Sequence, residues 1–411
     1  MPTRPVIGWE KPAPVPNHRF NDYLSARNGR LFYEDLDLAQ LVMGGGHDQG
    51  VGRALGSPLE FIYLPMIRKK ITALQDVFAE AIAELKYPGR FHYAYTSKAN
   101  ATEEVVRTAL GVGTHYEITS WIDLEIVRLM RARGLVKPEQ MIICNGFKGA
   151  GSRYVDEILK FSRDHANTVC IVEDLAELRP LIDSGQRLQV GLRQKSYGKH
   201  TDMAEMEHAN SRFGMNLGDI WTAADQIAAA PNLEPILYHA MLGSQIVDEE
   251  EFVARLTPPI EIYAHLRRRI PTLRIFDFGG GVPAGLTLDF TFDYGHFARR
   301  LLHTLQDLCA RFEVPPPDVL GEFGRYTVSE HSAHFFKVIA AKDNGSPYPW
   351  YVIDGSIMSS MPDIWGLDEH FIVLPLNHLD KPFRRVQLSP RWKSTVTCCS
   401  RPRSIPTRSA A

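Results

Sequence analysis

The sequence predicts a (β/α)8 TIM-type barrel followed by a smaller all-β C-terminal domain. Eight short apolar segments alternate with segments of helical periodicity between residues 91 and 325. Apolar strands that alternate with helices indicate a parallel sheet covered on both faces, and eight such units indicate a closed barrel. After residue 325 short apolar segments of strand type follow one another, which indicates the second domain. An open doubly wound sheet is the alternative interpretation of the same alternation.

The expected elements follow one another at regular intervals. Before the barrel, a strand that can join the second domain is expected at 59–64 and an amphipathic helix at 67–85. The barrel strands are expected at 91–97, 115–120, 141–146, 168–174, 187–194, 233–242, 272–280 and 318–325. Helices follow every strand except the last, at 101–111, 121–133, 151–165, 175–184, 217–229, 249–269 and 293–312. Strands of the second domain are expected within 326–341, 350–357, 371–376 and 384–388.

These elements divide the chain into four predicted parts. They are an N-terminal arm at 1–56, the barrel at 57–325, an apparently incomplete β domain at 326–388 and a tail at 389–411. The arm is rich in proline and is expected to be loose over residues 1–30. The tail contains five Arg or Lys residues, no acid and little apolar periodicity, so it is expected to be disordered.

Composition limits the partners and the compartment. The 411 residues are 44% hydrophobic and 23% charged, which suffices for a large core. The net charge of −2 predicts no nucleic-acid partner. Neither a membrane-spanning segment nor a signal peptide is expected, because the chain has no sufficiently long apolar stretch. The chain has five cysteines without zinc-type spacing, so no metal site is expected. The cysteines are expected to be reduced thiols in the cytoplasm.

Three motifs stand at predicted strand ends, which is where barrels carry their chemistry. Lys98 in "FHYAYTSKAN" ends the first strand, and a lysine amine can form a Schiff base. Gly279–Gly281 in "FDFGGGVP" end the seventh, where glycine lets backbone N–H groups approach a phosphate. In "GEFGRYTV" at the eighth, Glu322 can face a cationic ring nitrogen and Arg325 can bind phosphate beside Gly324. Together these features predict a pyridoxal 5'-phosphate site.

Each motif also has an ordinary interpretation. The lysine can be a solvated side chain, the glycines a flexible turn, and the acid and arginine a surface ion pair. Their order at three strand ends favours the functional interpretation. At the sixth strand end, "LYHAMLGSQI" offers His239, by default a core histidine, and Gly243 and Ser244 as phosphate donors. Arg193 at the fifth strand end and Glu117 in the second strand are assigned to the site by position alone.

At this point the chain resembles the alanine-racemase-like pyridoxal phosphate enzymes, and within them the ornithine, diaminopimelate and arginine decarboxylases. The resemblance covers residues 57–388 and is strongest to the biosynthetic arginine decarboxylases. The segments that carry it are "GSPLEFIYLP", "ICNGFK", "SRFGMN", "LGSQI" and "DGSIMSSMPDIWGLDEHFIVLPLNHL". The last segment discriminates best, because its Pro-Asp-x-Trp pattern is not general among the ornithine enzymes.

The resemblance implies roles for individual residues. Lys98 matches the Schiff-base lysine, and Glu322 matches the acid that faces the ring nitrogen. The positions that match phosphate-binding residues are Gly279, Gly280, Gly281, Gly324 and Arg325. Asp354 in "YVIDGS" matches an acid that faces the distal cationic end of the substrate.

The implied activity is decarboxylation of a basic amino acid, with arginine to agmatine in polyamine biosynthesis as the leading reaction. Ornithine, diaminopimelate or a carboxylated polyamine are alternative substrates. A pyridoxal phosphate-binding protein without turnover is an alternative of another class. The family also implies a homodimer.

Two departures from the family pattern stand out. Met241 occupies the position of a histidine that stacks on the cofactor ring in the family, while His239 points the same way two residues earlier. The family's "TCDS"-type segment supplies a proton-donor cysteine and a substrate-binding aspartate, but Cys398–Cys399 lack that aspartate. The family-like sequence ends near Leu388, so a frame change or truncation is hypothesised. The sequence therefore predicts cofactor binding with weak or absent decarboxylation.

Overall fold

The computed structural model describes residues 13–44, 54–149, 151–195, 211–345, 347–360, 371–384 and 386–390. The chain forms two compact units. The barrel unit comprises Tyr63–Ala284 and Phe292–His331. The β unit comprises the described residues of 1–62, 285–291 and 332–411. These limits differ from the predicted barrel limits of 57 and 325, because the strand near residue 60 pairs within the β unit and a short helix follows the last barrel strand.

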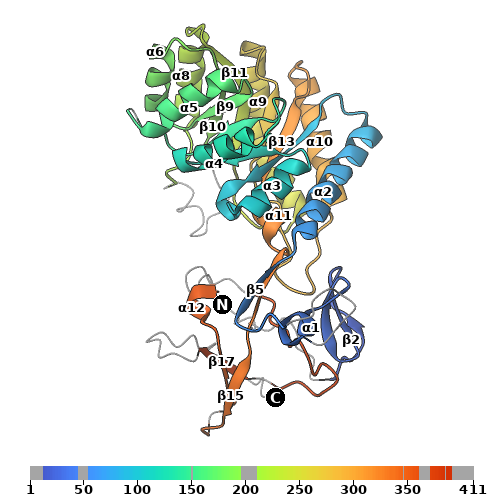
Figure 1. The fold of residues 1–411 in the computed structure, drawn as a ribbon. Coiled ribbons are helices and arrows are strands. Elements are labelled where there is room, and N and C mark those ends of the chain that lie inside the picture. Colours follow the sequence, from blue (N-terminus) through green and yellow to red (C-terminus); the bar gives the residue numbers. More distant parts are fainter. Residues whose placement is uncertain are drawn as a thin grey trace. The chain divides into compact units, whose positions relative to one another are not determined.

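Eight parallel strands close into a barrel, which confirms the predicted fold and excludes the open doubly wound sheet (Figure 1). Around the barrel the order is β10-β11-β12-β13-β6-β7-β8-β9, so the first barrel strand, β6, pairs with the last, β13. The strands are β6 Phe91–Thr96, β7 His115–Ile118, β8 Ile142–Cys144, β9 Thr168–Val172, β10 Leu188–Gln194, β11 Leu233–Ala240, β12 Ile275–Asp277 and β13 Asp318–Phe323.

Helices cover the outside of the barrel in the predicted order. They are α2 Leu64–Leu85, α3 Glu103–Gly111, α4 Trp121–Ala132, α5 Arg153–Asp164, α6 Leu178–Asp183, α8 Leu217–Ala228, α9 Glu249–Arg269, α10 Tyr294–Arg311 and α11 Arg325–Val328. Two short 3-10 turns are η1 Ser97–Ala99 and η2 Leu175–Glu177. The strongest boundary signals belong to α9, which has the Asp248 N-cap, acids in its first turn and arginines in its last turn.

The β unit contains a four-stranded sheet that begins inside the expected loose segment, and the expectation of a loose arm at 1–30 is wrong over residues 18–30. The sheet consists of β1 His18–Arg19, β2 Leu24–Arg27, β3 Arg30–Tyr33 and β4 Leu36–Asp37, followed by α1 Leu38–Met43. Its central turn is Asn28-Gly29, where both residues have positive φ, 50° and 75°. An Asn-Gly pair in this conformation matches the twist of a hairpin, so the local signal for the sheet is present in the sequence.

The remaining β-unit strands follow the prediction only in part. β5 Leu59–Ile62 pairs antiparallel with β14 Ser332–Phe335, as expected for a strand that joins the second domain. A three-stranded sheet comprises β15 Val338–Lys342, β16 Trp350–Ile353 and β17 Gln387–Pro390, with the short helix α12 Ile357–Ser360 nearby in the chain. β17 extends to Pro390, so the predicted tail boundary at 389 is too early. Residues 391–411 lie outside the described part of the chain.

The expected strand at 371–376 is absent from the described residues there. Instead, this region is tied to the β2–β3 hairpin by single hydrogen bonds, such as that from Leu31 N–H to the Leu376 carbonyl at 2.9 Å. Pro375 has no N–H to contribute to a ladder, which explains why an apolar run here does not continue as a strand.

Candidate active site

A layer of polar side chains lies at the C-terminal ends of the barrel strands. Residues two apart in a strand point to the same face. Asn145, His239, Asp277 and Glu322 each stand two residues after a member of a small buried apolar cluster. Those members are Ile143, Leu237, Ile275 and Leu320. The polar residues therefore continue the face on which this apolar cluster packs.

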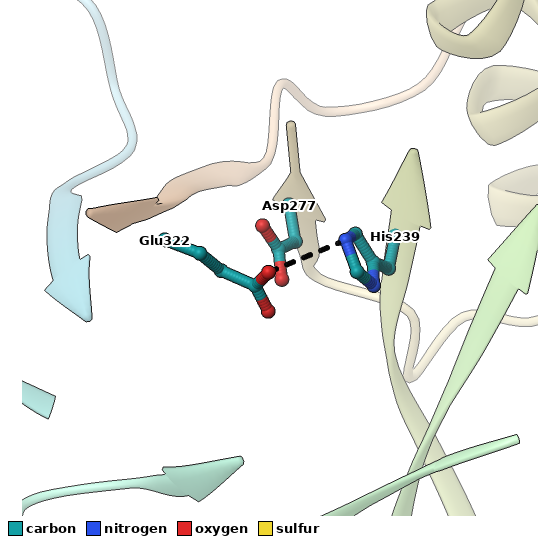
Figure 2. Close-up of side chains that lie close together, drawn as sticks. All are labelled: His239, Asp277 and Glu322. Atoms are coloured by element: carbon teal, nitrogen blue, oxygen red, sulfur yellow. Dashed lines mark ion pairs between the residues drawn. The ribbon is translucent and has the colours of Figure 1, made fainter. Parts of the chain in front are cut away.

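Three members of the layer come close together (Figure 2). One ligand-type atom each from His239, Asp277 and Glu322 lies within 4.8 Å of the others, and all three residues are buried. His239 Nε2 is 3.6 Å from Glu322 Oε2, and neither ring nitrogen of His239 has a hydrogen-bond partner. Asp277 Oδ1 accepts the Gly279 N–H at 2.8 Å. The cluster is thus a buried polar group with unused hydrogen-bonding capacity.

Burial governs the charge of this cluster. Burial, together with the nearby charges of Arg193 and Lys98, holds the pKa of His239 well below its usual value, so the imidazole is neutral. Burial and the Glu322 charge raise the pKa of Asp277 well above its usual value, which favours its protonated form. Burial also raises the pKa of Glu322, while the positive charges of Lys98 and Arg193 oppose that rise.

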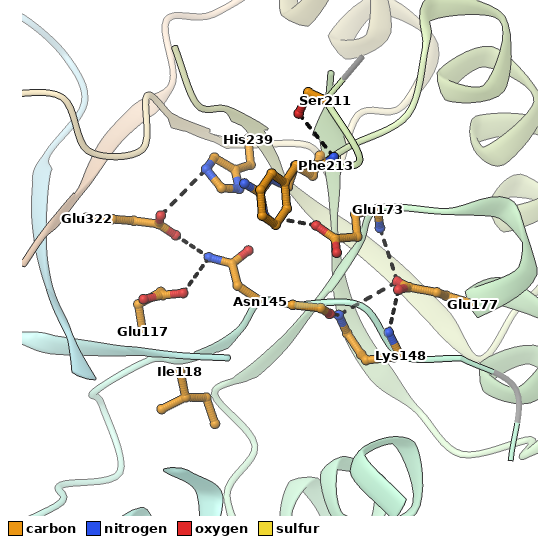
Figure 3. Close-up of polar contacts among 12 residues, drawn as sticks. Glu117, Ile118, Asn145, Lys148, Glu173, Glu177, Ser211, Phe213, His239 and Glu322 are labelled. Carbon is orange, nitrogen blue, oxygen red and sulfur yellow. Dashed lines mark hydrogen bonds and ion pairs between the residues drawn. The ribbon is translucent and has the colours of Figure 1, made fainter. Parts of the chain in front are cut away.

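Glu117 completes this layer through a hydrogen bond with Asn145, a residue to which the sequence analysis gave no site role (Figure 3). The Asn145 side-chain amide donates to Glu117 Oε1 at 2.9 Å and to Glu322 Oε1 at 2.6 Å. Glu117 is fully buried, and burial with the Glu322 charge raises its pKa to about 7. Glu117 had been assigned by position alone, and Asn145 had been noted only inside "ICNGFK". The sequence feature that could have indicated a site role for Asn145 is that it is a polar residue directly after a wholly apolar strand.

Lys98 lies in the turn η1, directly after β6, and is exposed. Its charge lowers the pKa values of Glu117 and Glu322, which places the amine near the acidic layer. Gly324 allows this arrangement, because a Cβ at this position would lie 2.9 Å from Ala99 Cβ in the same turn. The lysine turn and the end of β13 therefore depend on each other for their close packing.

The glycine segment after β12 packs against the end of β11. Gly279 has φ of 69°, and a Cβ there would lie 2.7 Å from Met241 Sδ and 3.1 Å from His239 Nε2. The Gly280 N–H meets Met241 Sδ at 3.1 Å. The Gly279 N–H donates to Asp277, so it is not available to bind a phosphate. This glycine instead leaves the room that a side chain would occupy. This differs from the expectation that all three amides face a phosphate.

Of the other expected phosphate residues, Gly243 lies beside this segment. A Cβ on Gly281 would lie 3.2 Å from the Gly243 carbonyl oxygen. The Gly281 carbonyl also accepts the Ile246 N–H at 3.0 Å. Ser244 is exposed, and Arg325 is half-buried in the first turn of α11.

Arg193 enters the site from β10 and is held by Glu173 at 2.9 Å. Its guanidinium also lies 5.1 Å from the Phe213 ring, in the segment that follows residue 210. Glu173 in turn is linked to the buried residue Glu177. The Glu177 carboxylate accepts hydrogen bonds from the backbone N–H groups of Glu173 and Lys148, at 3.1 and 2.6 Å (Figure 3). Arg193 is thus a cation that Glu173 holds in place. Its charge lowers the pKa values of Glu117, Glu322 and His239.

Asp354, the expected substrate contact, belongs to the β unit. Its carboxylate accepts hydrogen bonds from the Ser57 hydroxyl at 2.6 Å and from the Lys337 N–H at 2.8 Å. Both carboxylate oxygens therefore already have partners within that unit. Cys398 and Cys399 lie outside the described residues.

The residues present fit a pyridoxal phosphate group. A lysine amine lies near a buried carboxylate, a glycine segment leaves room that a Cβ would fill, and the His239 nitrogens have no partners. Three ligand-type atoms as close as those of His239, Asp277 and Glu322 also suit a cation in general. The lysine and the glycine segment beside them favour the organic cofactor.

A parallel barrel with a lysine turn, a glycine segment and buried carboxylates at its strand ends defines a class of cofactor-binding barrel proteins. The chain belongs to the pyridoxal-dependent decarboxylases: the family's pyridoxal binding domain matches residues 67–329. Its cofactor is accordingly pyridoxal phosphate.

Several curated proteins that are similar to the chain are arginine decarboxylases. A biosynthetic arginine decarboxylase of Synechocystis sp. is 26% identical over 353 residues, which are 80% of this chain and 50% of the relative. Arginine decarboxylase 1 of Oryza sativa subsp. japonica is 27% identical over 343 residues, or 78% of this chain and 48% of the relative. The chain thus spans about half the length of the curated relatives it matches.

Solved structures agree on the fold. The biosynthetic arginine decarboxylase of Campylobacter jejuni aligns with a TM-score of 0.76 at 19% identity, covering 91% of this chain and 77% of that one. A diaminopimelate decarboxylase of M. jannaschii gives a TM-score of 0.74 at 17% identity, covering 92% and 82%. Among the described residues, no helix combines the length and the apolar character needed to cross a membrane.

Proposed function

We propose that the chain decarboxylates L-arginine to agmatine with pyridoxal phosphate, as a step of polyamine biosynthesis. The observation that carries the proposal is the buried Glu322 carboxylate, which lies near the Lys98 amine at the end of the barrel strands. Family membership and the arginine decarboxylase relatives support the reaction and the substrate.

In this proposal each residue has one task. When bound, the cofactor supplies an electron-accepting ring that takes up the electron pair left at Cα as carbon dioxide departs. Lys98 attaches the cofactor covalently. Glu322 keeps a proton on the ring nitrogen, because a carboxylate beside a ring nitrogen favours its charged form. His239 remains neutral beside Glu322, so it adds no charge to the resting site.

The remaining site residues bind the phosphate and the substrate. Arg325 supplies a charge-assisted contact to the phosphate, next to amides of Gly280, Gly281, Gly243 and the Ser244 hydroxyl. Gly279 and Gly324 give the room that these contacts need. Asp354 is proposed to meet the cationic end of the substrate, for which it would have to exchange one of its present partners.

We further propose a homodimer in a reducing, cytoplasmic compartment. Cys144, Cys170 and Cys309 are buried without a disulfide, which is typical of proteins kept in reducing surroundings. Light scattering of the purified chain measures the assembly directly, and a monomeric mass would contradict the dimer.

A second candidate is a pyridoxal phosphate-binding protein without turnover. The observation that favours it is Met241, whose sulfur already contacts the Gly280 N–H where the family places a ring-stacking histidine. A thioether can pack on an aromatic face but contributes no proton.

One experiment separates the candidates. The purified chain is supplied with pyridoxal phosphate, and carbon dioxide release is measured from arginine, ornithine, diaminopimelate and carboxylated polyamines, with Lys98→Ala as the control. Release from arginine alone supports the proposal, while release from another substrate reassigns it. Cofactor absorbance without release from any substrate supports the second candidate, and failure to acquire cofactor absorbance contradicts both.

A further inference from the structure

The amide of Asn145 lies between two buried carboxylates. Its Nδ2 donates one hydrogen to Glu117 Oε1 at 2.9 Å and the other to Glu322 Oε1 at 2.6 Å (Figure 3). Asn145 is itself 2% exposed, and its backbone N–H is held by the Ile118 carbonyl at 2.8 Å. The bridging side chain is therefore enclosed, and its backbone is held in place beside the two acids.

The two acids differ in their other partners. Glu117 is 0% exposed and its Oε2 has no hydrogen-bond partner, whereas Glu322 is 7% exposed and has the Asp277 side chain as a further hydrogen-bond partner that lowers its pKa. Burial favours the protonated form of a carboxyl group, while each further hydrogen-bond donor favours the ionised form. The unequal surroundings therefore direct the proton to Glu117 and the negative charge to Glu322.

We propose that Asn145 is a positioning residue that bridges Glu117 and Glu322, so that Glu117 carries the proton and Glu322 stays ionised toward the cofactor ring nitrogen. The inference rests on the proposed function only for the cofactor role of Glu322. The bridge itself is a property of the chain without its cofactor.

The titratable groups that act on the bridged acids come from several strand ends. Lys98 follows β6, Arg193 lies on β10, His239 on β11 and Asp277 on β12. Lys98 and Arg193 lower the pKa values of both bridged acids, as does the Asn145 amide, while burial raises them. Removing the amide should therefore raise both pKa values, and the pKa of Glu117 should move upward from about 7.

The test follows the carboxyl groups in the full-length chain without added cofactor. The infrared absorption of the protonated Glu117 carboxyl is titrated with pH and is assigned by its loss in Glu117→Gln. In Asn145→Ala the midpoint should rise by about 1 pH unit, which is the lower bound for losing a hydrogen bond to a charged group. Asn232→Ala is the matched control, because the Asn232 amide holds only backbone carbonyls such as that of Leu181. This control should lower stability and leave the midpoint unchanged.

A second titration uses the chain loaded with pyridoxal phosphate. The pH dependence of the cofactor's visible absorbance should shift in Asn145→Ala, and in Glu117→Gln it should shift in the opposite direction, because a neutral neighbour favours ionised Glu322. The Glu117→Gln measurement keeps the proposal testable if Asn145→Ala does not fold. Unchanged carboxyl midpoints in folded Asn145→Ala, or an unchanged absorbance profile in loaded Glu117→Gln, overturn the inference. If the wild type fails to take up cofactor, the proposed function fails, while the carboxyl titration still decides the role of Asn145.

Discussion

Gly324→Ala tests whether the close packing of the lysine turn is required. The added Cβ would lie 2.9 Å from Ala99 Cβ, whereas carbon atoms in ordinary contact are about 3.5–4.0 Å apart. The two segments must therefore separate by about 0.6 Å or more. Overpacking of this kind destabilises by about 1–3 kcal/mol. Each kcal/mol corresponds to a fall in melting temperature of about 2–4 °C for a unit of this size.

The assay compares thermal unfolding and covalent cofactor loading for Gly324→Ala and two partner variants. Gly111→Ala is the matched control, since a Cβ at the end of α3 meets nothing within 4 Å. Ala99→Gly removes the atom that the new methyl would strike, so the double variant should recover part of both losses. If Gly324→Ala melts and loads like Gly111→Ala, or if Ala99→Gly restores nothing, the packing argument is wrong.

Three further predictions follow from the site and the barrel. Glu322→Gln should retain cofactor binding but slow the chemical step, whereas Arg325→Ala should weaken cofactor binding by about 1.5–3 kcal/mol. Equilibrium binding of the cofactor and single-turnover rates distinguish the two variants. The reverse pattern would refute the assigned roles. His115 on β7 has its pKa lowered to about 3 by burial, so the unfolded chain binds the proton first and stability falls as pH drops from about 6.5 toward 3. His115→Gln should reduce this slope by roughly 1 kcal/mol per pH unit, measured by urea unfolding, and an unchanged slope would contradict the cause.

The barrel could be predicted because its signals are local and repeated. The strands and helices have distinct periodicities, and α9 carries its caps and terminal charges in the sequence, so its predicted limits of 249–269 agree with the structure. The β unit was harder, because strands such as β1 and β4 have two residues each and no periodicity to detect. The Asn28-Gly29 pair does indicate a hairpin, but the proline-rich composition around it favoured the interpretation as a loose arm.

The candidate site divides in the same way. Lys98, the glycine segment and Glu322 were found because their motifs stand at strand ends, where a barrel gathers them. Asn145 was missed because its role depends on the spatial proximity of two acids on β7 and β13, far apart in the sequence. The orientation of the Gly279 amide toward Asp277 likewise depends on local backbone geometry that a glycine run does not specify.

The most direct test of the account is the identity of the lysine that holds the cofactor. The full-length chain is loaded with pyridoxal phosphate, reduced with borohydride, digested and mapped by mass spectrometry, with Lys148 serving as the internal control because it is fully buried against Glu177. The account predicts a single modified site at Lys98 and loss of the visible absorbance in Lys98→Ala. An adduct on another lysine, or full absorbance in Lys98→Ala, would contradict it.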